Sequence, residues 1–355
     1  MAIDKYGIDN HKLLYHVDRV HDWLHHKNIY PIYMEISPTG SCNHRCMFCS
    51  VDFMGYQKRA LNTNMLKVRL QEMGRLGIKG IMYAGEGEPF LHKDMVELIT
   101  HTKQSGIDVA LTTNGVLMKP DVLENILRLT TWIKVSCNAG TAETYKKIHQ
   151  GTTKDFERVL ANLRYAVQLK ETHKYACTLG LQIILIPENA HEVEKLAIIS
   201  RDIGLDYLVV KPYTHHAQNM HNYNIRYEEY LDLIEALRQY NTEDFSVICR
   251  LRAMQKWDQK QRKYSKCLAL PFWSYIDAGG YVWGCSAHLG DQRFVYGNIY
   301  SQSFQEIWEG DKRQQSLEWV EQNFNIESCK LNCRMDEVNQ YLWKLKYPPG
   351  HVNFI

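Results

Sequence analysis

The chain alternates short apolar runs with longer amphipathic segments between residues 32 and 213, and this rhythm limits its fold more than any other feature. The apolar runs have the length and composition of strands, and the segments between them carry apolar residues at helical spacing. Strands joined by helices form a parallel sheet with right-handed crossovers. We therefore predict an α/β fold, a partial (β/α)6 TIM-like barrel. Its six predicted strands lie in YPIYMEI, KGIMYAG, IDVALTTNG, TWIKVSC, LGLQIILI and LDYLVVKPY.

A loop with three cysteines follows the first predicted strand. Cys42, Cys46 and Cys49 are spaced C-x3-C-x2-C. Ligands in such folds bind at the carboxyl ends of the strands, which is where this loop lies. Three thiolates can hold three irons of a cubane cluster and leave one iron open, whereas a zinc site needs a fourth ligand nearby. His44 is the local rival for that fourth position, and zinc and a disulfide are the alternative interpretations.

The spacing of these cysteines, with the aromatic Phe48 just before the last one, resembles the radical S-adenosylmethionine (radical SAM) superfamily. The resemblance implies that the open iron of a [4Fe-4S] cluster binds the amino and carboxylate groups of SAM. One electron then cleaves SAM to a 5′-deoxyadenosyl radical, which takes a hydrogen atom from the substrate. A reduced donor of the flavodoxin or ferredoxin type is the expected redox partner.

Glycines and polar residues end the next three predicted strands, and the resemblance implies that they contact SAM. The segment AGEGEP resembles the G-G-E-P motif of the family, although Glu86 replaces its first glycine. Simple turns are the alternative interpretation of these Gly-Pro and Asn-Gly segments. The candidate SAM contacts are Phe48, Gly85, Glu86, Gly87, Glu88, Thr113, Asn114, Ser136 and Asn138.

Two polar residues of the later strands are candidates for contact with the substrate. Gln182 is the polar residue of an otherwise apolar run, and Lys211 lies at the end of the last predicted strand. Lys211 leads into a loop rich in His and Tyr, which suits an oxygen-rich or phosphorylated substrate. A solvated linker is the alternative interpretation of that loop. We predict that Lys211 and Gln182 are the catalytic residues.

A second set of four cysteines lies in the C-terminal third of the chain. Cys267 is followed by a predicted hairpin with its turn at Gly279–Gly280 and then by Cys285, and Cys329 and Cys333 come later. On spacing alone these four thiolates could hold a structural zinc. The pattern resembles the auxiliary iron–sulfur modules of radical SAM enzymes known as SPASM and twitch domains, most closely the shorter twitch type. That resemblance implies a second [4Fe-4S] cluster without an open iron.

The motif positions divide the chain into four parts. We predict an N-terminal helical extension (1–30), a radical SAM partial barrel (31–225), a helical linker (226–262), and a small α+β auxiliary-cluster domain (263–355).

Composition narrows the classes of function. The formal net charge is +2, so we expect no nucleic-acid partner. No run of 18 apolar residues occurs and the N-terminus lacks an apolar signal segment, so we expect a cytoplasmic protein that does not cross a membrane. Ten cysteines in a reducing compartment favour metal or catalytic use over disulfides.

The resemblance implies a radical SAM oxidoreductase, a dehydrogenase or an epimerase. The expected substrate is a carbohydrate, an aminocyclitol-like compound or a phosphorylated small molecule. An epimerase would need a thiol to return a hydrogen atom, and only Cys137, Cys177 and Cys249 lie outside the two predicted cluster sites. Oxidation is therefore favoured. Radical modification of a ribosomal peptide and a non-catalytic iron–sulfur scaffold are the two alternatives.

Overall fold

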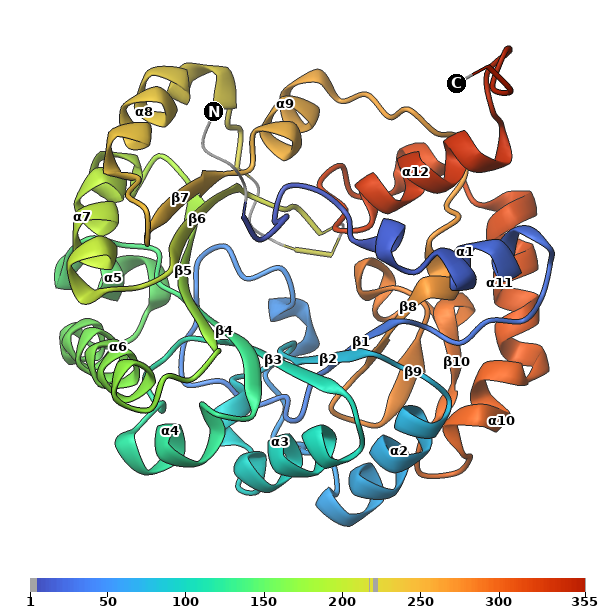
Figure 1. Ribbon diagram of the computed structural model, residues 1–355, viewed down its shortest axis with the longest axis horizontal. Coiled ribbons are helices and arrows are strands. Elements are labelled where there is room, and N and C mark those ends of the chain that lie inside the picture. The colour runs from blue at the N-terminus through green and yellow to red at the C-terminus, as the bar shows by residue number, and fades with distance from the viewer. Residues whose placement is uncertain (1–4, 217, 220–222, 355) are drawn as a thin grey trace.

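The computed structural model describes residues 5–216, 218–219 and 223–354, and its strands form one sheet in the order β10-β9-β8-β1-β2-β3-β4-β5-β6-β7. The strands from β1 to β7 curve around a common interior, and the helices from α2 to α8 cover their outer side (Figure 1). The strands are β1 (Tyr33–Ile36), β2 (Gly80–Tyr83), β3 (Asp108–Thr113), β4 (Thr130–Ser136), β5 (Thr178–Leu185), β6 (Tyr207–Pro212), β7 (Ser246–Cys249), β8 (Trp273–Ile276), β9 (Tyr281–Trp283) and β10 (Val295–Asn298).

The helices alternate with the strands as the hydrophobic pattern predicts. Local signals in the sequence set several of their ends: the Asn62 side chain accepts from the N–H of Met65 at the start of α2, and Gly204 ends α7 at a φ of 90°. The helices are α1 (Val17–Leu24), α2 (Thr63–Arg75), α3 (Met95–Gln104), α4 (Pro120–Ile126), α5 (Ala142–His149), α6 (Thr153–His173), α7 (Val193–Ile203), α8 (Leu231–Ala236), α9 (Leu251–Gln259), α10 (Phe304–Glu309), α11 (Asp311–Asn323) and α12 (Asp336–Lys346).

The six predicted barrel strands are all present and parallel, and a seventh extends them. Strand β7 pairs with β6 in parallel register, Tyr207 opposite Ser246. It lies inside the segment 226–262, which the sequence analysis predicted to be a helical linker. That prediction is wrong at this point, because a run of only four residues, SVIC, between polar segments has too short a pattern to show its period.

The C-terminal module continues the barrel sheet. Strand β8 pairs in parallel with β1, Met34 opposite Ser274, so β1 has β2 on one side and β8 on the other. The predicted hairpin is formed by β8 and β9, and β10 pairs antiparallel with β9. The predicted fold class, a partial barrel with a small α+β module, is confirmed.

Apolar side chains fill two main regions. The large core lies between the barrel strands and their helices, with Leu66, Leu98, Ile133 and Leu181 among its fully buried members. A smaller core surrounds Cys285 in the C-terminal module and includes Trp273, Phe294 and Val320.

The N-terminal extension packs against two distant parts of the chain. Helix α1 lies beside α12 (Figure 1), where Val20 and Trp23 belong to one apolar cluster with Leu342. Farther upstream, Tyr6 and Ile8 pack on inward-facing residues of β6 and β7. Residues 1–4 of the predicted extension lie outside the described part of the chain.

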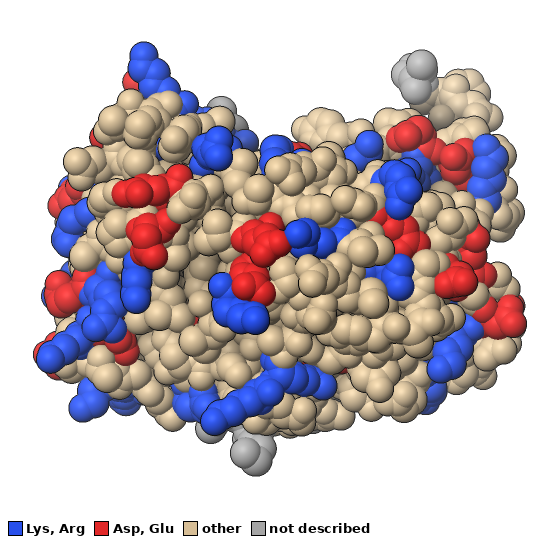
Figure 2. All heavy atoms as spheres, turned by 90° about the horizontal axis from the view of Figure 1, so that it is seen from below, with Lys and Arg blue, Asp and Glu red and all other residues tan. Residues whose placement is uncertain are grey.

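The surface charges and the helices of the described chain are plain in two respects. Basic and acidic side chains are interspersed over the face seen from below, without a continuous basic stripe on that face (Figure 2). Within the described residues, no helix combines the length and the apolar character needed to span a membrane.

Asn339 of α12 fixes the start of the C-terminal module, which leads to a stability prediction. Its Oδ1 accepts from the N–H groups of Leu268 (2.7 Å) and Ala269 (3.0 Å), and the residue is buried. We expect Asn339→Leu to lower the free energy of unfolding by about 2–4 kcal/mol, because two buried N–H groups lose their acceptor. Anaerobic urea denaturation followed by circular dichroism measures the change. Lys344→Leu, on the exposed side of the same helix, should change it by less than about 0.5 kcal/mol; equal losses in the two variants would contradict the assignment.

Candidate functional site

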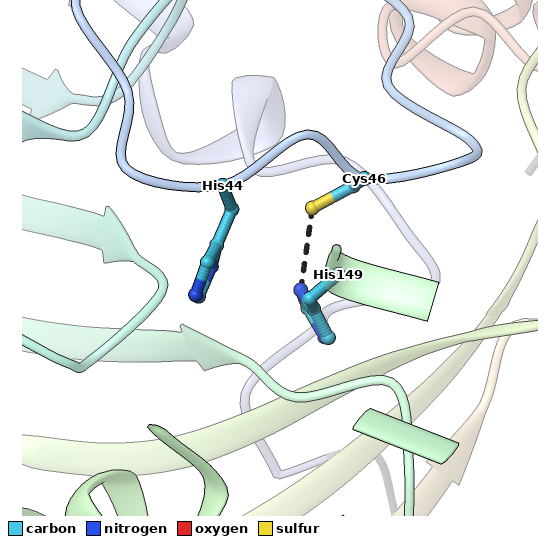
Figure 3. Close-up of side chains that lie close together, drawn as sticks. All are labelled: His44, Cys46 and His149. Atoms are coloured by element: carbon cyan, nitrogen blue, oxygen red, sulfur yellow. Dashed lines mark hydrogen bonds between the residues drawn. The ribbon is translucent and has the colours of Figure 1, made fainter. Parts of the chain in front are cut away.

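The three-cysteine loop leaves the carboxyl end of β1 and docks on the C-terminus of α5. The N–H of Arg45 donates to the carbonyl of His149 and the N–H of Met47 donates to that of Ile148, both at 3.0 Å. The last carbonyls of a helix have no partner within the helix, so these two bonds satisfy α5 and position the loop together. Figure 3 shows the consequence, with Cys46 directed at the ring of His149.

The loop thiols fit a positively charged iron cluster. Burial is the main cause that raises the pKa of Cys42, to about 11, and the pKa of Cys46 is raised further above its ordinary value by burial and by Cys49 and Cys42. Three neighbouring thiolates repel one another in this buried place unless a cation neutralises them. Cys42, Cys46 and Cys49 are therefore suited to hold the predicted cluster, which remains a prediction for these three residues.

The glycine-rich turn after β2 lies directly against the cysteine loop. The N–H of Glu88 donates to the carbonyl of Ser41 at 2.8 Å. A Cβ on Gly87 would lie 2.1 Å from that same carbonyl oxygen, and Gly85 has a φ of 120° that disfavours other residues. Gly87 is therefore needed for the close approach of the turn to the loop, and Gly85 for the conformation of the turn itself.

The carboxylates of the turn already have protein partners. Glu86 accepts from Arg59 (2.8 Å) and from the N–H of Ala278 in the β8–β9 turn (3.0 Å). Glu88 accepts from the hydroxyl of Thr113 (2.6 Å) and the N–H of Asn114 (2.8 Å). These bonds join the turns after β2, β3 and β8, so the two carboxylates organise the site.

The remaining candidate SAM contacts surround the same loop. The Asn114 amide donates to the side chain of Asn43 within the loop at 2.7 Å. Phe48 is buried and meets the ring of His149 edge-on. Asn138 is buried and engaged internally, with its Oδ1 accepting from the N–H of Ile184 (2.7 Å). The half-buried Ser136 ends β4. The structure brings these residues together, and their contact with SAM remains a prediction.

A separate cavity of about 490 Å³ opens inside the barrel and contains both predicted catalytic residues, Lys211 and Gln182. Ser50, one residue after the cluster loop's last cysteine, lines it on one side, and Cys333 of the second cysteine set lines it on another. The candidate SAM contacts do not line it among the described residues. The cavity therefore lies between the two cysteine sites.

Lys211 and the four cationic side chains that lower its pKa all line this cavity, and only Lys211 was predicted. The pKa of Lys211 is held well below its ordinary value. Burial is the largest cause, followed by the positive charges of Lys134, Arg250, Arg334 and Lys330. Burial, then Arg334 and Arg250, lowers the pKa of Lys134 to about 8. Arg334 pairs with Glu35, and Arg250 approaches Asp9 at 3.5 Å. Within the described part of the chain, no ion pair is found for Lys134 or Lys211. Three further cations, Lys12, Arg252 and Lys256, and three carboxylates, Asp9, Asp336 and Glu337, also line the cavity. Arg252 pairs with Glu337, and Lys256 pairs with Asp336.

One of these missed residues left a signal in the sequence. Lys134 lies two positions before Ser136 on one strand, so alternation alone places both side chains on the inner face. Arg250 directly follows β7, and the sequence analysis predicted a helical linker there. Lys330 and Arg334 flank Cys333, where no pattern distinguished them from surface charges.

The second set of cysteines converges as predicted. Cys267, Cys285, Cys329 and Cys333 line one small pocket together with the aromatic rings of Tyr264 and Phe294. Burial raises the pKa of Cys267 to about 11 and that of Cys329 to about 12, with the nearby Cys333 raising both. Cys285 is buried and the other three cysteines are half-buried. Four thiols in one apolar pocket fit a closed metal or iron–sulfur site.

Comparison with protein families supports both sites. Residues 36–198 match the radical SAM superfamily, and residues 267–334 match the iron-sulfur cluster-binding domain called SPASM. Both predicted modules are thereby confirmed. Together they imply SAM, a SAM-binding [4Fe-4S] cluster and an auxiliary [4Fe-4S] cluster as cofactors.

Curated relatives match about half of the chain. A probable GTP 3′,8-cyclase of Saccharolobus islandicus (strain M.14.25 / Kamchatka #1) is 30% identical over 175 residues, which are 49% of this chain and 54% of that protein. Another from Methanocaldococcus jannaschii is 30% identical over 180 residues, 48% of this chain and 55% of that protein. The chain spans about half the length of the curated relatives it matches.

Solved structures show the same fold over most of the chain. SuiB of Streptococcus suis bound to its precursor peptide SuiA is 17% identical and aligns with a TM-score of 0.66 over 94% of this chain and 78% of that one. The enzyme anSMEcpe with bound AdoMet is also 17% identical, with a TM-score of 0.59 over 87% of this chain and 85% of that one. At these identities the likeness concerns the fold alone.

The close approach of Gly87 to the cysteine loop gives a direct prediction. We expect Gly87→Ala to reduce iron after anaerobic reconstitution from about eight towards about four atoms per chain, because its methyl group would displace Ser41 and the cysteines that follow. Iron and sulfide analysis measures this. Gly80→Ala in β2 is the matched control, because its Cβ would meet no atom nearer than 4.0 Å. Full iron content in Gly87→Ala would contradict the proposed tight docking.

Proposed function

Because this chain carries a radical SAM domain followed by a SPASM-type iron–sulfur domain, we propose that it is a radical SAM dehydrogenase of an anionic small molecule. When bound and reduced, the N-terminal cluster would supply the chemistry of its superfamily, reductive cleavage of SAM to a 5′-deoxyadenosyl radical that removes a substrate hydrogen atom. The barrel cavity, bounded by Ser50 on one side and Cys333 on the other, is the observation that supports this proposal most strongly.

The lining of the cavity supports an anionic substrate. Strand β4 carries Lys134, strand β6 carries Lys211, and Arg250 directly follows β7. Lys330 and Arg334 line the same cavity. Buried cations are costly unless a negative group pairs with them. A phosphate or carboxylate of the substrate would pair with the charged Lys134, and the neutral amine of Lys211 would donate a hydrogen bond to it. Gln182 between them can accept or donate a hydrogen bond to a hydroxyl group.

The same cavity supports oxidation over epimerisation. A substrate that loses a hydrogen atom and then a proton and an electron is oxidised by two electrons. Lys211 is suited to accept the proton, because its lowered pKa favours the neutral amine. Cys333 lies where an electron would leave the cavity for the auxiliary site. Of the described cysteines, only Cys333 lines the cavity, which leaves Cys137, Cys177 and Cys249 without access as hydrogen donors.

The experiment that tests this function is anaerobic reconstitution followed by reduction in the presence of SAM. The candidate substrates are sugar phosphates, carboxylated aminocyclitols, GTP and short peptides. GTP is included because the curated relatives are probable GTP 3′,8-cyclases. We expect 5′-deoxyadenosine and a product two hydrogens lighter than an anionic substrate. In deuterated solvent, deuterium on a substrate carbon would support epimerisation instead, turnover of peptides alone would support peptide modification, and no deoxyadenosine would favour a non-catalytic scaffold.

The pKa of Lys134 gives a pH prediction. A pKa of about 8 means that the side chain is charged at pH 7 and neutral at pH 9, so affinity for an anion should fall as pH rises between them. Sulfate keeps its charge over this range and serves as the probe in calorimetric titrations. We expect its affinity to fall several-fold from pH 7 to pH 9 in the unaltered protein.

Matched variants identify the lysine responsible. Lys134→Met should bind sulfate weakly at pH 7 and show little further loss at pH 9. Lys312→Met, which removes an exposed lysine of α11, should behave like the unaltered protein. Unchanged pH dependence in Lys134→Met would contradict the prediction.

A further inference from the structure

His149 is a buried residue outside the predicted cysteine motif that directly contacts one of its members. It is the last residue of α5, and its Nδ1 lies 3.2 Å from the Sγ of Cys46, although 103 positions separate the two residues. Figure 3 shows the ring and the sulfur facing each other. No local sequence pattern points to a role for His149.

The other ring nitrogen fixes which atom carries the proton. The backbone N–H of Asn138 donates to Nε2 of His149 at 3.1 Å. A backbone N–H can only donate, so Nε2 must offer its lone pair. A neutral imidazole with an accepting Nε2 carries its proton on Nδ1. The bond between His149 and Cys46 therefore runs from Nδ1–H to sulfur.

The surroundings hold the ring in this orientation. Tyr145, one turn earlier in α5, stacks on His149 with ring centroids 4.1 Å apart. The Asn138 amide lies 3.3 Å from Nε2, and its Oδ1 is held by the N–H of Ile184, which keeps its NH₂ group toward the imidazole. The carbonyl of Asn138 in turn accepts from Asn189 at 3.0 Å. Such a shell of partners orients the groups around a metal site.

We propose that His149 is a positioning residue that donates an Nδ1–H···S hydrogen bond to the Cys46 thiolate and raises the reduction potential of the SAM-binding cluster. Reduction adds negative charge that the cluster sulfurs share, so a donor at one sulfur stabilises the reduced state more than the oxidised state. The inference rests on Cys46 being a ligand of that cluster, as in the proposed function.

A mononuclear metal site is the rival interpretation of the same residues. His44, Cys46 and His149 place one ligand atom each within 4.8 Å of one another (Figure 3). Such a site would need the Cys46 thiolate that the three-cysteine cluster also needs, so the two cannot coexist. It would also make His149 a direct ligand through Nδ1, which is a different bond and gives a different spectroscopic signature.

The test is an EPR-monitored redox titration of the reconstituted full-length protein. The SAM-binding cluster is recognised by the change of its signal on addition of SAM. We expect His149→Leu to lower the ratio of reduced to oxidised cluster about tenfold at a given potential, which for a one-electron couple is a shift of about 59 mV. His149→Asn keeps an N–H donor near the position of Nδ1 and should retain most of the unaltered potential. Equal potentials in the unaltered protein and His149→Leu, or equal shifts in both variants, would overturn the proposal.

A second measurement needs no stable leucine variant. In protein labelled with ¹⁵N-histidine, pulsed EPR of the reduced cluster should detect a weak nitrogen coupling and an exchangeable proton, and His149→Asn should lose the nitrogen coupling. A strong coupling, typical of a directly bound nitrogen, or no coupling, would overturn the hydrogen bond.

Cys46→Ala separates this inference from the proposed function. If the SAM-responsive cluster persists in that variant, the assignment of Cys46 as a ligand fails, and the cluster site of the proposed function fails with it. If the cluster is lost in Cys46→Ala but His149→Leu keeps the unaltered potential, only the role of His149 is overturned.

Discussion

The parallel pairing of β1 with both β2 and β8 is the constraint on which the rest of the structure depends. Because β1 lies inside the sheet, the three-cysteine loop leaves a strand that is held on both sides. The turn after β2 and the turn after β8 then meet through Glu86, which accepts from Arg59 and from the N–H of Ala278. Radical SAM domain and auxiliary module thus share one rigid sheet, and both sites are positioned from it.

The cavity between the two cysteine sites contains two lysines that lower the stability of the fold. Lys134 and Lys211 lie on inward-facing strand positions, where an apolar side chain would be cheaper to bury. Burial lowers the pKa of each, and neighbouring cations lower it further: Arg334 and Arg250 act on both lysines, and Lys134 also acts on Lys211. A fold retains such residues where the stabilising partner arrives from outside, which is consistent with a substrate that carries negative charge.

The sequence predicted those features that depend on local patterns. The six barrel strands followed from apolar periodicity, and the two cysteine sets from short spacings. Strand β7 was missed because four residues are too few to show a period, and with it Arg250 was missed. Lys134 could have been found by counting alternate positions back from Ser136. His149 could not, because its contact with Cys46 exists only after α5 packs under a loop 103 positions away.

The segment from Lys330 to Met335, with Trp273 of β8, forms the wall between the cavity and the auxiliary pocket, and this has a thermodynamic consequence. Lys330, Cys333 and Arg334 face the cavity, while Cys333 also lines the pocket of the second cysteine set. Charge added on one side of this segment changes the electrostatic free energy on the other. By linkage, an anion that binds more tightly when the auxiliary site is oxidised must also shift that site's redox equilibrium toward oxidation, by the same free energy. Anion binding in the cavity and the redox state of the auxiliary site would then report the same coupling free energy.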